Sequence, residues 1–223
     1  MDMNGDGRKD LLIGRTNAKA QREGDGELIW LEHPAGDALD GTEWTEHVIT
    51  TGPDVWTSID TMAAYSGELI VWSAQFFDET VSVHRVSLTD GTLISSKVID
   101  NNTIAMEGYK VMRGFKFHPV DLNGDGNKQV LYSNQEGDSS VNGVWVYEVP
   151  ADIISGTYTK HTLATGFERA WKYWLSDIGA PGFTFVFYPD GNTSSRAHIL
   201  VCGQGNERLW LLTPIGNASQ FEY

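Results

Sequence analysis

The sequence predicts an all-β protein, and within this class a β-propeller built from four-stranded blades. Three observations predict it. A short loop rich in Asp, Asn and Gly occurs twice, an aspartate recurs at intervals of 58, 61 and 56 residues, and each recurrence precedes short apolar runs separated by turn residues. About four strands in each ~58-residue repeat is the plan of a propeller blade. The recurring aspartates are Asp2, Asp60, Asp121 and Asp177.

The first ten residues, MDMNGDGRKD, have the ligand spacing of a calcium loop. A short apolar run, 11–14, follows directly and suits a strand better than a helix. An EF-hand would also need Glu where this chain has Ile13, so the sequence predicts a calcium loop ahead of a strand. Side-chain oxygens would come from positions 1, 3, 5 and 9 and a carbonyl from position 7, that is from Asp2, Asn4, Asp6, Asp10 and Arg8.

A second copy of this loop lies in VDLNGDGNKQVLYS, residues 120–133. Gln129 replaces the last carboxylate, and we expect a weaker or empty site because calcium affinity follows ligand charge. The alternative is that both loops are Asx-rich turns that bind nothing, since Asn-Gly and Asp-Gly pairs are turn signals by themselves. The predicted ligands of the second loop are Asp121, Asn123, Asp125, Asn127 through its carbonyl, and Gln129.

Composition excludes several classes of function. The chain has 223 residues, 40% of them hydrophobic, and a formal net charge of −14, which disfavours nucleic acid and anionic membranes as partners. No apolar run approaches the length of a membrane span. Cys202 is alone and follows an apolar run, so we expect a small buried hydrophobe and not a nucleophile. The sequence contains no zinc-protease motif, nucleophile elbow, phosphate loop or dinucleotide fingerprint.

The repeat divides the chain into four units of a single propeller, at about 1–53, 54–106, 107–166 and 167–223. The stretch 181–196 is predicted to be an insertion in the fourth unit. The first unit begins at its calcium loop and lacks the inner strand that should precede it. An open sheet edge at 11–14 would invite pairing with another strand, so we expect self-association or a missing N-terminal part.

The segments DMNGDGRKDLLIG, WLEHP and WTEHVI resemble the FG-GAP/VCBS repeat family of calcium-binding β-propellers. The resemblance covers the whole chain in its repeat architecture, although only two of the four units carry the calcium loop. It implies structural calcium and no organic cofactor. The sequence is also similar to fungal propeller enzymes, namely aldos-2-ulose dehydratase and the hetero-Diels–Alder cyclases of tropolone–sesquiterpenoid pathways.

The start of each inner strand pairs a carboxylate with a nearby aromatic residue, and these starts line one mouth of a propeller's channel. Such a ring suits an apolar or planar ligand held by aromatic faces with acids and bases beside it. The alternative is blade-to-blade packing with a solvated rim. The predicted catalytic residues are Asp54, Glu107, Glu168 and Lys110. The predicted substrate-binding residues are Trp56, Tyr109, Phe115, Phe117, Trp171, Tyr173 and Trp174.

Three functions follow from this pattern. The first is a lyase or cyclase, in which Asp54 or Glu107 assists loss of water and the aromatic ring holds apolar partners in reacting geometry. The second is a lectin-like module that stacks sugars on aromatic platforms, and the third is a scaffold stiffened by calcium. His47 and His161 occupy equivalent strand positions, and we expect them to be packing or hydrogen-bonding elements.

Overall fold

The computed structural model describes residues 1–16, 26–54, 56–76, 80–101, 113–136, 140–168, 180–203, 208–216 and 221–223. Strands dominate these residues. The one helical element among them is the 3-10 turn η1 (Ala63–Tyr65), and no helix in the described ranges is long and apolar enough to cross a membrane. The predicted all-β class is therefore confirmed.

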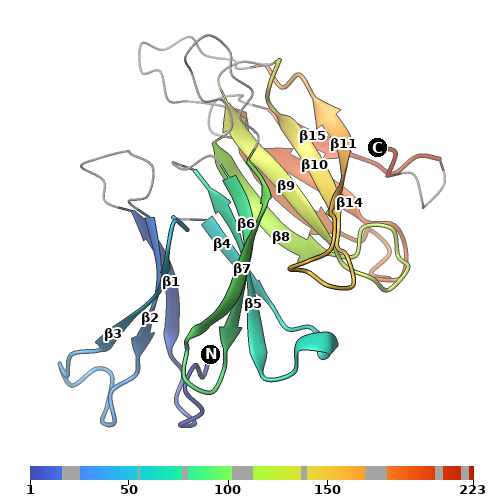
Figure 1. Ribbon diagram of the computed structural model, residues 1–223. Coiled ribbons are helices and arrows are strands. Elements are labelled where there is room, and N and C mark those ends of the chain that lie inside the picture. Colours follow the sequence, from blue (N-terminus) through green and yellow to red (C-terminus); the bar gives the residue numbers. More distant parts are fainter. Residues whose placement is uncertain are drawn as a thin grey trace, which may run out of the picture.

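The strands form four antiparallel sheets that follow one another along the chain (Figure 1). Among the described residues the first and fourth sheets have three strands each, and the second has four. The first sheet contains β1 (Leu11–Thr16), β2 (Gly26–Glu32) and β3 (Thr45–Thr51). The second contains β4 (Trp56–Asp60), β5 (Glu68–Gln75), β6 (Thr80–Ser87) and β7 (Leu93–Asp100). The third contains β8 (Gly114–Val120), β9 (Gln129–Glu136), β10 (Gly143–Glu148) and β11 (Thr159–Thr165), with the short β12 (Ala180–Pro181) beside β9. The fourth contains β13 (Phe183–Phe187), β14 (His198–Cys202) and β15 (Leu209–Leu212).

Among the described residues, three hydrophobic cores fill the spaces between consecutive sheets, so the sheets stack face to face in chain order. The central strands supply both neighbouring cores because successive side chains point to opposite faces. On β5, Leu69 and Val71 enter the core with the first sheet, while Ile70 and Trp72 enter the core with the third. This explains why the sequence of a central strand such as β5 is continuously apolar. A strand with one exposed face would alternate apolar and polar residues.

The fourth sheet differs from its prediction. β13 lies within the stretch 181–196, which was predicted to be an insertion, and it pairs with β14 as the first strand of the sheet. The prediction was wrong because the repeat was aligned on Asp177, which lies outside the described residues. This alignment left the β-branched and aromatic run FTFVF, which favours a strand, inside the supposed insertion. At the other end of the chain, β1 is the edge strand of the first sheet within the described residues, as expected.

A buried histidine in the second sheet makes stability depend on pH. His84 on β6 is 4% exposed, its Nε2 lies 3.0 Å from Ser73 Oγ, and burial lowers its pKa to about 4. An unfolded histidine titrates near 6.5, so between these values the unfolded chain binds a proton that the folded chain excludes. The contribution of His84 to the free energy of unfolding is therefore complete above pH ~6.5 and is lost as the pH falls toward 4.

We expect acidification from pH 7 to 4.5 to destabilise the protein, with His84 contributing up to about 3 kcal/mol to the loss. Urea unfolding at both pH values checks this for the wild type and for His84→Gln, whose amide can still bond to Ser73. The variant should lose less stability on acidification. An equal loss in both proteins would show that His84 does not carry the effect.

Candidate functional site

Aromatic side chains from the first strands of three successive sheets meet in one cluster. β4 packs against β8, and β8 packs against β13. The ring centroids of Trp56 and Phe115 are 4.5 Å apart, those of Phe115 and Phe183 are 4.8 Å apart, and those of Trp56 and Phe183 are 5.3 Å apart. All three side chains are half-buried. The structure thus brings together the predicted Trp56 and Phe115, and it adds Phe183, which was hidden in the supposed insertion.

A β-bulge in β8 separates the two phenylalanines that were predicted to bind substrate together. The register of β8 on β9 shifts between Gly114 and Lys116, which leaves Phe115 as an extra residue without a partner. A bulge changes the direction of its side chain. Phe115 therefore joins the aromatic cluster, whereas Phe117 is 1% exposed in the core between the second and third sheets. The structure places Phe117 in that core, away from the surface of the cluster, which corrects its predicted role.

Two basic side chains on β8, one of them beside the aromatic cluster, were not among the predicted site residues. Lys116 Nζ is 5.6 Å from the ring centroids of both Phe183 and Phe185, and burial lowers the pKa of this amine. Two residues further along β8, burial and then the charge of Lys116 lower the pKa of His118 to about 4. His118 Nδ1 is buried and has no hydrogen-bond partner among the described residues. Neither was predicted as a site residue, because a lone Lys and a lone His on a strand match no motif.

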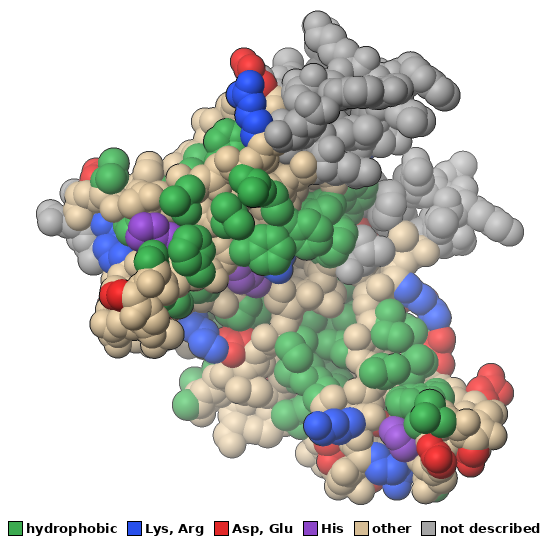
Figure 2. Space-filling model, turned by 180° about the vertical axis from the view of Figure 1, so that it is seen from behind, with side chains coloured by type: hydrophobic (Ala, Val, Ile, Leu, Met, Phe, Trp, Pro, Cys, Tyr) green, Lys and Arg blue, Asp and Glu red, His purple; other side chains and the backbone are tan. Residues whose placement is uncertain are grey.

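Hydrophobic side chains also remain exposed along the same strands. On β13, Phe185 is 50% exposed and Phe187 is also exposed, whereas the exposed Ile59 on β4 lines a hollow with Leu11 and Leu12 of the first sheet. Hydrophobic side chains gather on the face of the molecule in Figure 2, with Lys, Arg and His side chains among them. The aromatic cluster therefore borders accessible apolar surface, which a ligand could cover.

The predicted acids do not meet at this cluster in the described part of the chain. Asp54 is 1% exposed, just before β4, at the junction of the first two sheets. Its main-chain carbonyl lies so close to Gly14 that a Cβ at position 14 would come within 1.9 Å of the oxygen. This close approach requires glycine at position 14. Six further predicted residues lie outside the described residues, namely Glu107, Tyr109, Lys110, Trp171, Tyr173 and Trp174.

Glu168 borders a different cavity, of about 250 Å³, between β11 and β15. Phe167 and Trp210 form its aromatic wall, with ring centroids 5.1 Å apart in an edge-to-face arrangement. Glu168 and Arg208 supply one charge of each sign to its lining. Asn142, which is fully buried, fixes Phe167 by accepting a hydrogen bond from its N–H and donating one to its carbonyl.

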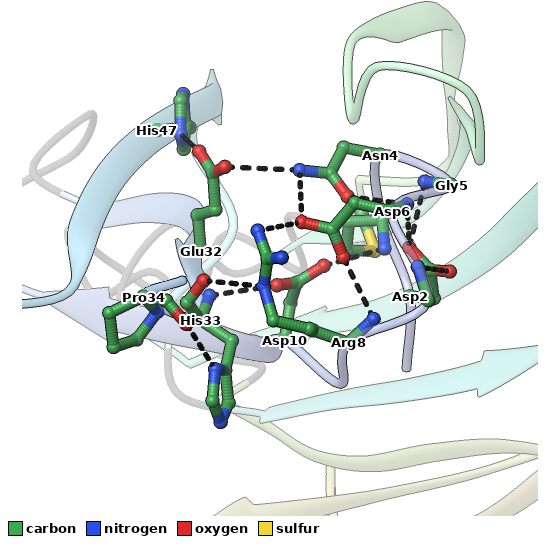
Figure 3. Close-up of polar contacts among 12 residues, drawn as sticks. Asp2, Asn4, Gly5, Asp6, Arg8, Asp10, Glu32, His33, Pro34 and His47 are labelled. Carbon is green, nitrogen blue, oxygen red and sulfur yellow. Dashed lines mark hydrogen bonds and ion pairs between the residues drawn. The ribbon is translucent and has the colours of Figure 1, made fainter. Parts of the chain in front are cut away.

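The first predicted calcium loop folds as a compact turn (Figure 3). Asp2 accepts hydrogen bonds from the main-chain N–H groups of Gly5, Asp6 and Gly7, and the Gly7 bond contributes most to lowering the pKa of Asp2. Gly5 and Gly7 have φ values of 76° and 85°, which L side chains rarely adopt. The loop therefore depends on glycine at both positions.

Asp10 ties this loop to the rest of the first sheet (Figure 3). Its two carboxylate oxygens accept hydrogen bonds from Met3 N at 2.7 Å and from His33 N at 2.9 Å, and the residue is 3% exposed. Asn4 Nδ2 donates to Glu32 Oε1, and the Arg8 guanidinium pairs with Asp6. The loop is thus braced against the end of β2.

The second loop repeats this fold but closes differently. Gly124 and Gly126 have φ values of 76° and 88°, nearly equal to those in the first loop, and both glycines donate hydrogen bonds to Asp121. Gln129 Oε1 accepts a hydrogen bond from Leu122 N, which fixes the orientation of the amide. Its Nε2 then donates to the Asn127 carbonyl at 2.9 Å and lies 3.4 Å from Asn123 Oδ1. Two of the oxygens predicted to bind calcium, those of Asn123 and Asn127, therefore face the N–H groups of the Gln129 amide.

The two equivalent histidines have the hydrogen-bonding role that was predicted. His47 Nε2 lies 2.8 Å from Glu32 Oε2, and its ring stacks on Trp30 at 4.1 Å. In the third sheet, His161 Nε2 lies 2.5 Å from Glu148 Oε1. In both sheets the glutamate stands two residues beyond the cross-strand partner of the histidine. Within the described ranges, His, Cys, Asp and Glu side chains form no group of three placed to hold a metal ion, so calcium would also need amide and main-chain oxygens.

Comparison with protein-family models and with curated proteins finds no match for this sequence. The resemblance to calcium-binding propellers therefore stays a prediction from the residues quoted above.

Proposed function

We propose that this protein is a β-propeller-type enzyme of the lyase or cyclase class, which binds an apolar or planar small molecule against the cluster of Trp56, Phe115 and Phe183. The observation that carries the proposal is the convergence of these rings from β4, β8 and β13 beside a basic group, the Lys116 amine. Aromatic walls with a few placed polar groups are the usual construction of small-molecule sites.

The chemistry follows from the groups that border the cluster. The rings supply dispersion contacts and hold a planar ligand in one orientation, which is where proximity contributes to rate. Lys116 and His118 can act on protons of a ligand that lies against Phe183 and Phe185. Loss of water from a hydroxylated precursor needs such a proton acceptor.

A binding titration tests the proposal with 2-acetylnaphthalene, a planar neutral probe, followed by tryptophan fluorescence and calorimetry. We expect Trp56→Ala to weaken binding about tenfold or more, because the lost ring contact and apolar area exceed about 1.4 kcal/mol. Trp44→Ala is the matched control, since Trp44 contacts His33 in the first sheet. Equal affinity of the wild type and Trp56→Ala would refute the proposed site.

We also propose that the first loop binds calcium as a structural ion. Asp2, Asn4 and Asp6 would supply side-chain oxygens and Arg8 its carbonyl, an all-oxygen set of the kind that calcium prefers. Asp2 Oδ2 and Asp6 Oδ1 each accept one main-chain N–H, from Gly7 and Arg8, and so retain a lone pair for the ion. In the second loop the Gln129 amide already satisfies two of the corresponding oxygens. The first loop is therefore the stronger candidate.

We expect calcium to raise the melting temperature and EDTA to lower it, with a stabilisation of about 2.7 kcal/mol at a hundredfold excess over Kd. Asp6→Asn should abolish this calcium dependence, whereas the matched Asp125→Asn change in the second loop should leave it. Thermal unfolding across a calcium titration measures both. A calcium response that survives in Asp6→Asn would exclude the first loop.

A second candidate function is glycan binding at the cavity between β11 and β15. Its aromatic wall of Phe167 and Trp210, with Glu168 and Arg208 beside it, provides a ring face and charged hydrogen-bonding groups together. Titration with methyl glycosides tests this function. If Trp210→Ala abolishes glycoside binding and Trp56→Ala does not, glycan binding is supported over the small-molecule enzyme.

A further inference from the structure

Lys116 differs from the other lysines that the structure describes. Lys97 donates to the Gly156 carbonyl, Lys128 pairs with Asp60, and Lys160 pairs with Asp100. Lys9 is exposed. The Lys116 amine is half-buried, it has no carboxylate partner among the described residues, and its neighbours are two phenyl rings.

These surroundings lower the pKa of the Lys116 amine. Burial penalises the ammonium, and no described anion restores it. The phenyl rings attract a cation, but phenylalanine is a weaker partner for it than a carboxylate. Desolvation increases the share of lysine that is present as free amine, and the free amine is the nucleophile.

His118 places a proton acceptor beside this amine. It lies two residues after Lys116, on the same face of β8. Its imidazole is mostly buried, and Nδ1 has no partner among the described residues. Because burial lowers its pKa to about 4, the ring is neutral at pH 7, and in the Nε2–H tautomer Nδ1 carries the lone pair.

We propose that Lys116 is an imine-forming lysine that takes an apolar aldehyde or ketone, with His118 as the proton acceptor. This inference rests on the proposed function, since it names the substrate class of the same site. A carbonyl compound that is planar and aromatic would lie against Phe183 and Phe185 and present its carbonyl carbon to the amine.

The steps balance without an oxidant or a reductant. The amine attacks the carbonyl carbon, a proton moves from nitrogen to oxygen, and the resulting hydroxyl takes up a further proton from solvent and leaves as water to give a protonated imine. His118 then accepts the proton from the α-carbon. The C–H electron pair forms a double bond to the former carbonyl carbon, and the C=N π pair moves to nitrogen to give an enamine. A hydroxyl on the β-carbon takes up the proton held by His118 and leaves as water, and a further water hydrolyses the protonated imine, which frees the amine and returns a proton to solvent. The net reaction converts a β-hydroxy carbonyl compound into an α,β-unsaturated one plus water.

Reductive trapping tests the amine directly. The folded protein is treated at pH 7 with 6-methoxy-2-naphthaldehyde or acetaldehyde in sodium cyanoborohydride, and each modified lysine is located by peptide mass spectrometry. We expect Lys116 to be modified several-fold faster than Lys9, because desolvation lowers the pKa of Lys116 and so increases its share of free amine at pH 7. Lys116→Met should lose the fast modification, and Lys128→Met should keep it. Uniform modification of all lysines, or fast modification that persists in Lys116→Met, would overturn the inference.

The two probes separate this inference from the proposed function. Acetaldehyde is too small to need the aromatic cluster, so it reports on the amine alone. If 2-acetylnaphthalene binds at Trp56 but all lysines are modified at the same rate, imine formation at Lys116 is refuted and the proposed function stands. If acetaldehyde modifies Lys116 fastest but 2-acetylnaphthalene does not bind, the reactive amine is supported and the aromatic binding site is refuted.

Discussion

Replacing Phe117 by alanine should lower the free energy of unfolding by about 3–5 kcal/mol, the usual cost of deleting a buried phenylalanine ring. Phe117 is 1% exposed, and its ring meets those of Trp72, Tyr132 and Tyr147 edge to face at 5.8, 6.0 and 5.8 Å. The change therefore leaves a cavity between the second and third sheets and also removes three aromatic contacts. Urea denaturation at pH 7 measures the loss.

Phe115→Ala is the matched control, because it removes the same ring two residues earlier on β8. Its side chain is half-buried in the aromatic cluster, so we expect a smaller loss of stability and a marked loss of 2-acetylnaphthalene binding. The opposite pattern, in which Phe117→Ala weakens ligand binding and spares stability, would restore the substrate-binding role predicted for Phe117.

The contrast between these two residues shows what the sequence could and could not predict. Alternation on a regular strand puts residues 115 and 117 on one face, and the prediction treated them alike. The bulge that separates them depends on the register between β8 and β9, which is a property of the pair of strands. No pattern within the segment GFKF indicates it.

The fold was predictable where the repeat carried a strong local signal. The loops around Asp2 and Asp121 predicted the turns before β1 and β9, and continuous apolar runs predicted strands that are buried on both faces. The fourth sheet was misassigned, since its loop after β13 lacks the Asn-Gly-Asp-Gly sequence and the period alone did not locate the strand. The same error hid Phe183 from the candidate site.

The basic groups at the site could not be found from the sequence for a different reason. Lys116 is ordinary in composition and spacing, and its significance comes from what surrounds it. Whether a lysine keeps its charge depends on burial and on the nearest anion, and both are set by residues from other strands. The sequence therefore shows that a lysine is present at position 116 but not which groups surround its amine.

Asn142→Ala should destabilise the protein by about 2–4 kcal/mol, because each buried polar group left without a partner costs ~1–3 kcal/mol. Asn142 is fully buried, its Nδ2 donates to the Phe167 carbonyl at 2.6 Å, and its Oδ1 accepts from the Phe167 N–H at 2.9 Å. Alanine removes both partners of one main-chain residue at once. It also frees the aromatic wall that Phe167 forms with Trp210.

Two measurements separate this mechanism from a general loss of packing. Hydrogen exchange should show the Phe167 amide losing protection in Asn142→Ala, while amides in the second sheet keep theirs, because the broken contacts lie at the junction of the third and fourth sheets. The exposed Asn101 supplies the control, since Asn101→Ala should change the stability by less than about 0.5 kcal/mol. If Asn142→Ala is as stable as Asn101→Ala, the side chain does not fix Phe167, and the wall of the cavity between β11 and β15 must be held by other contacts.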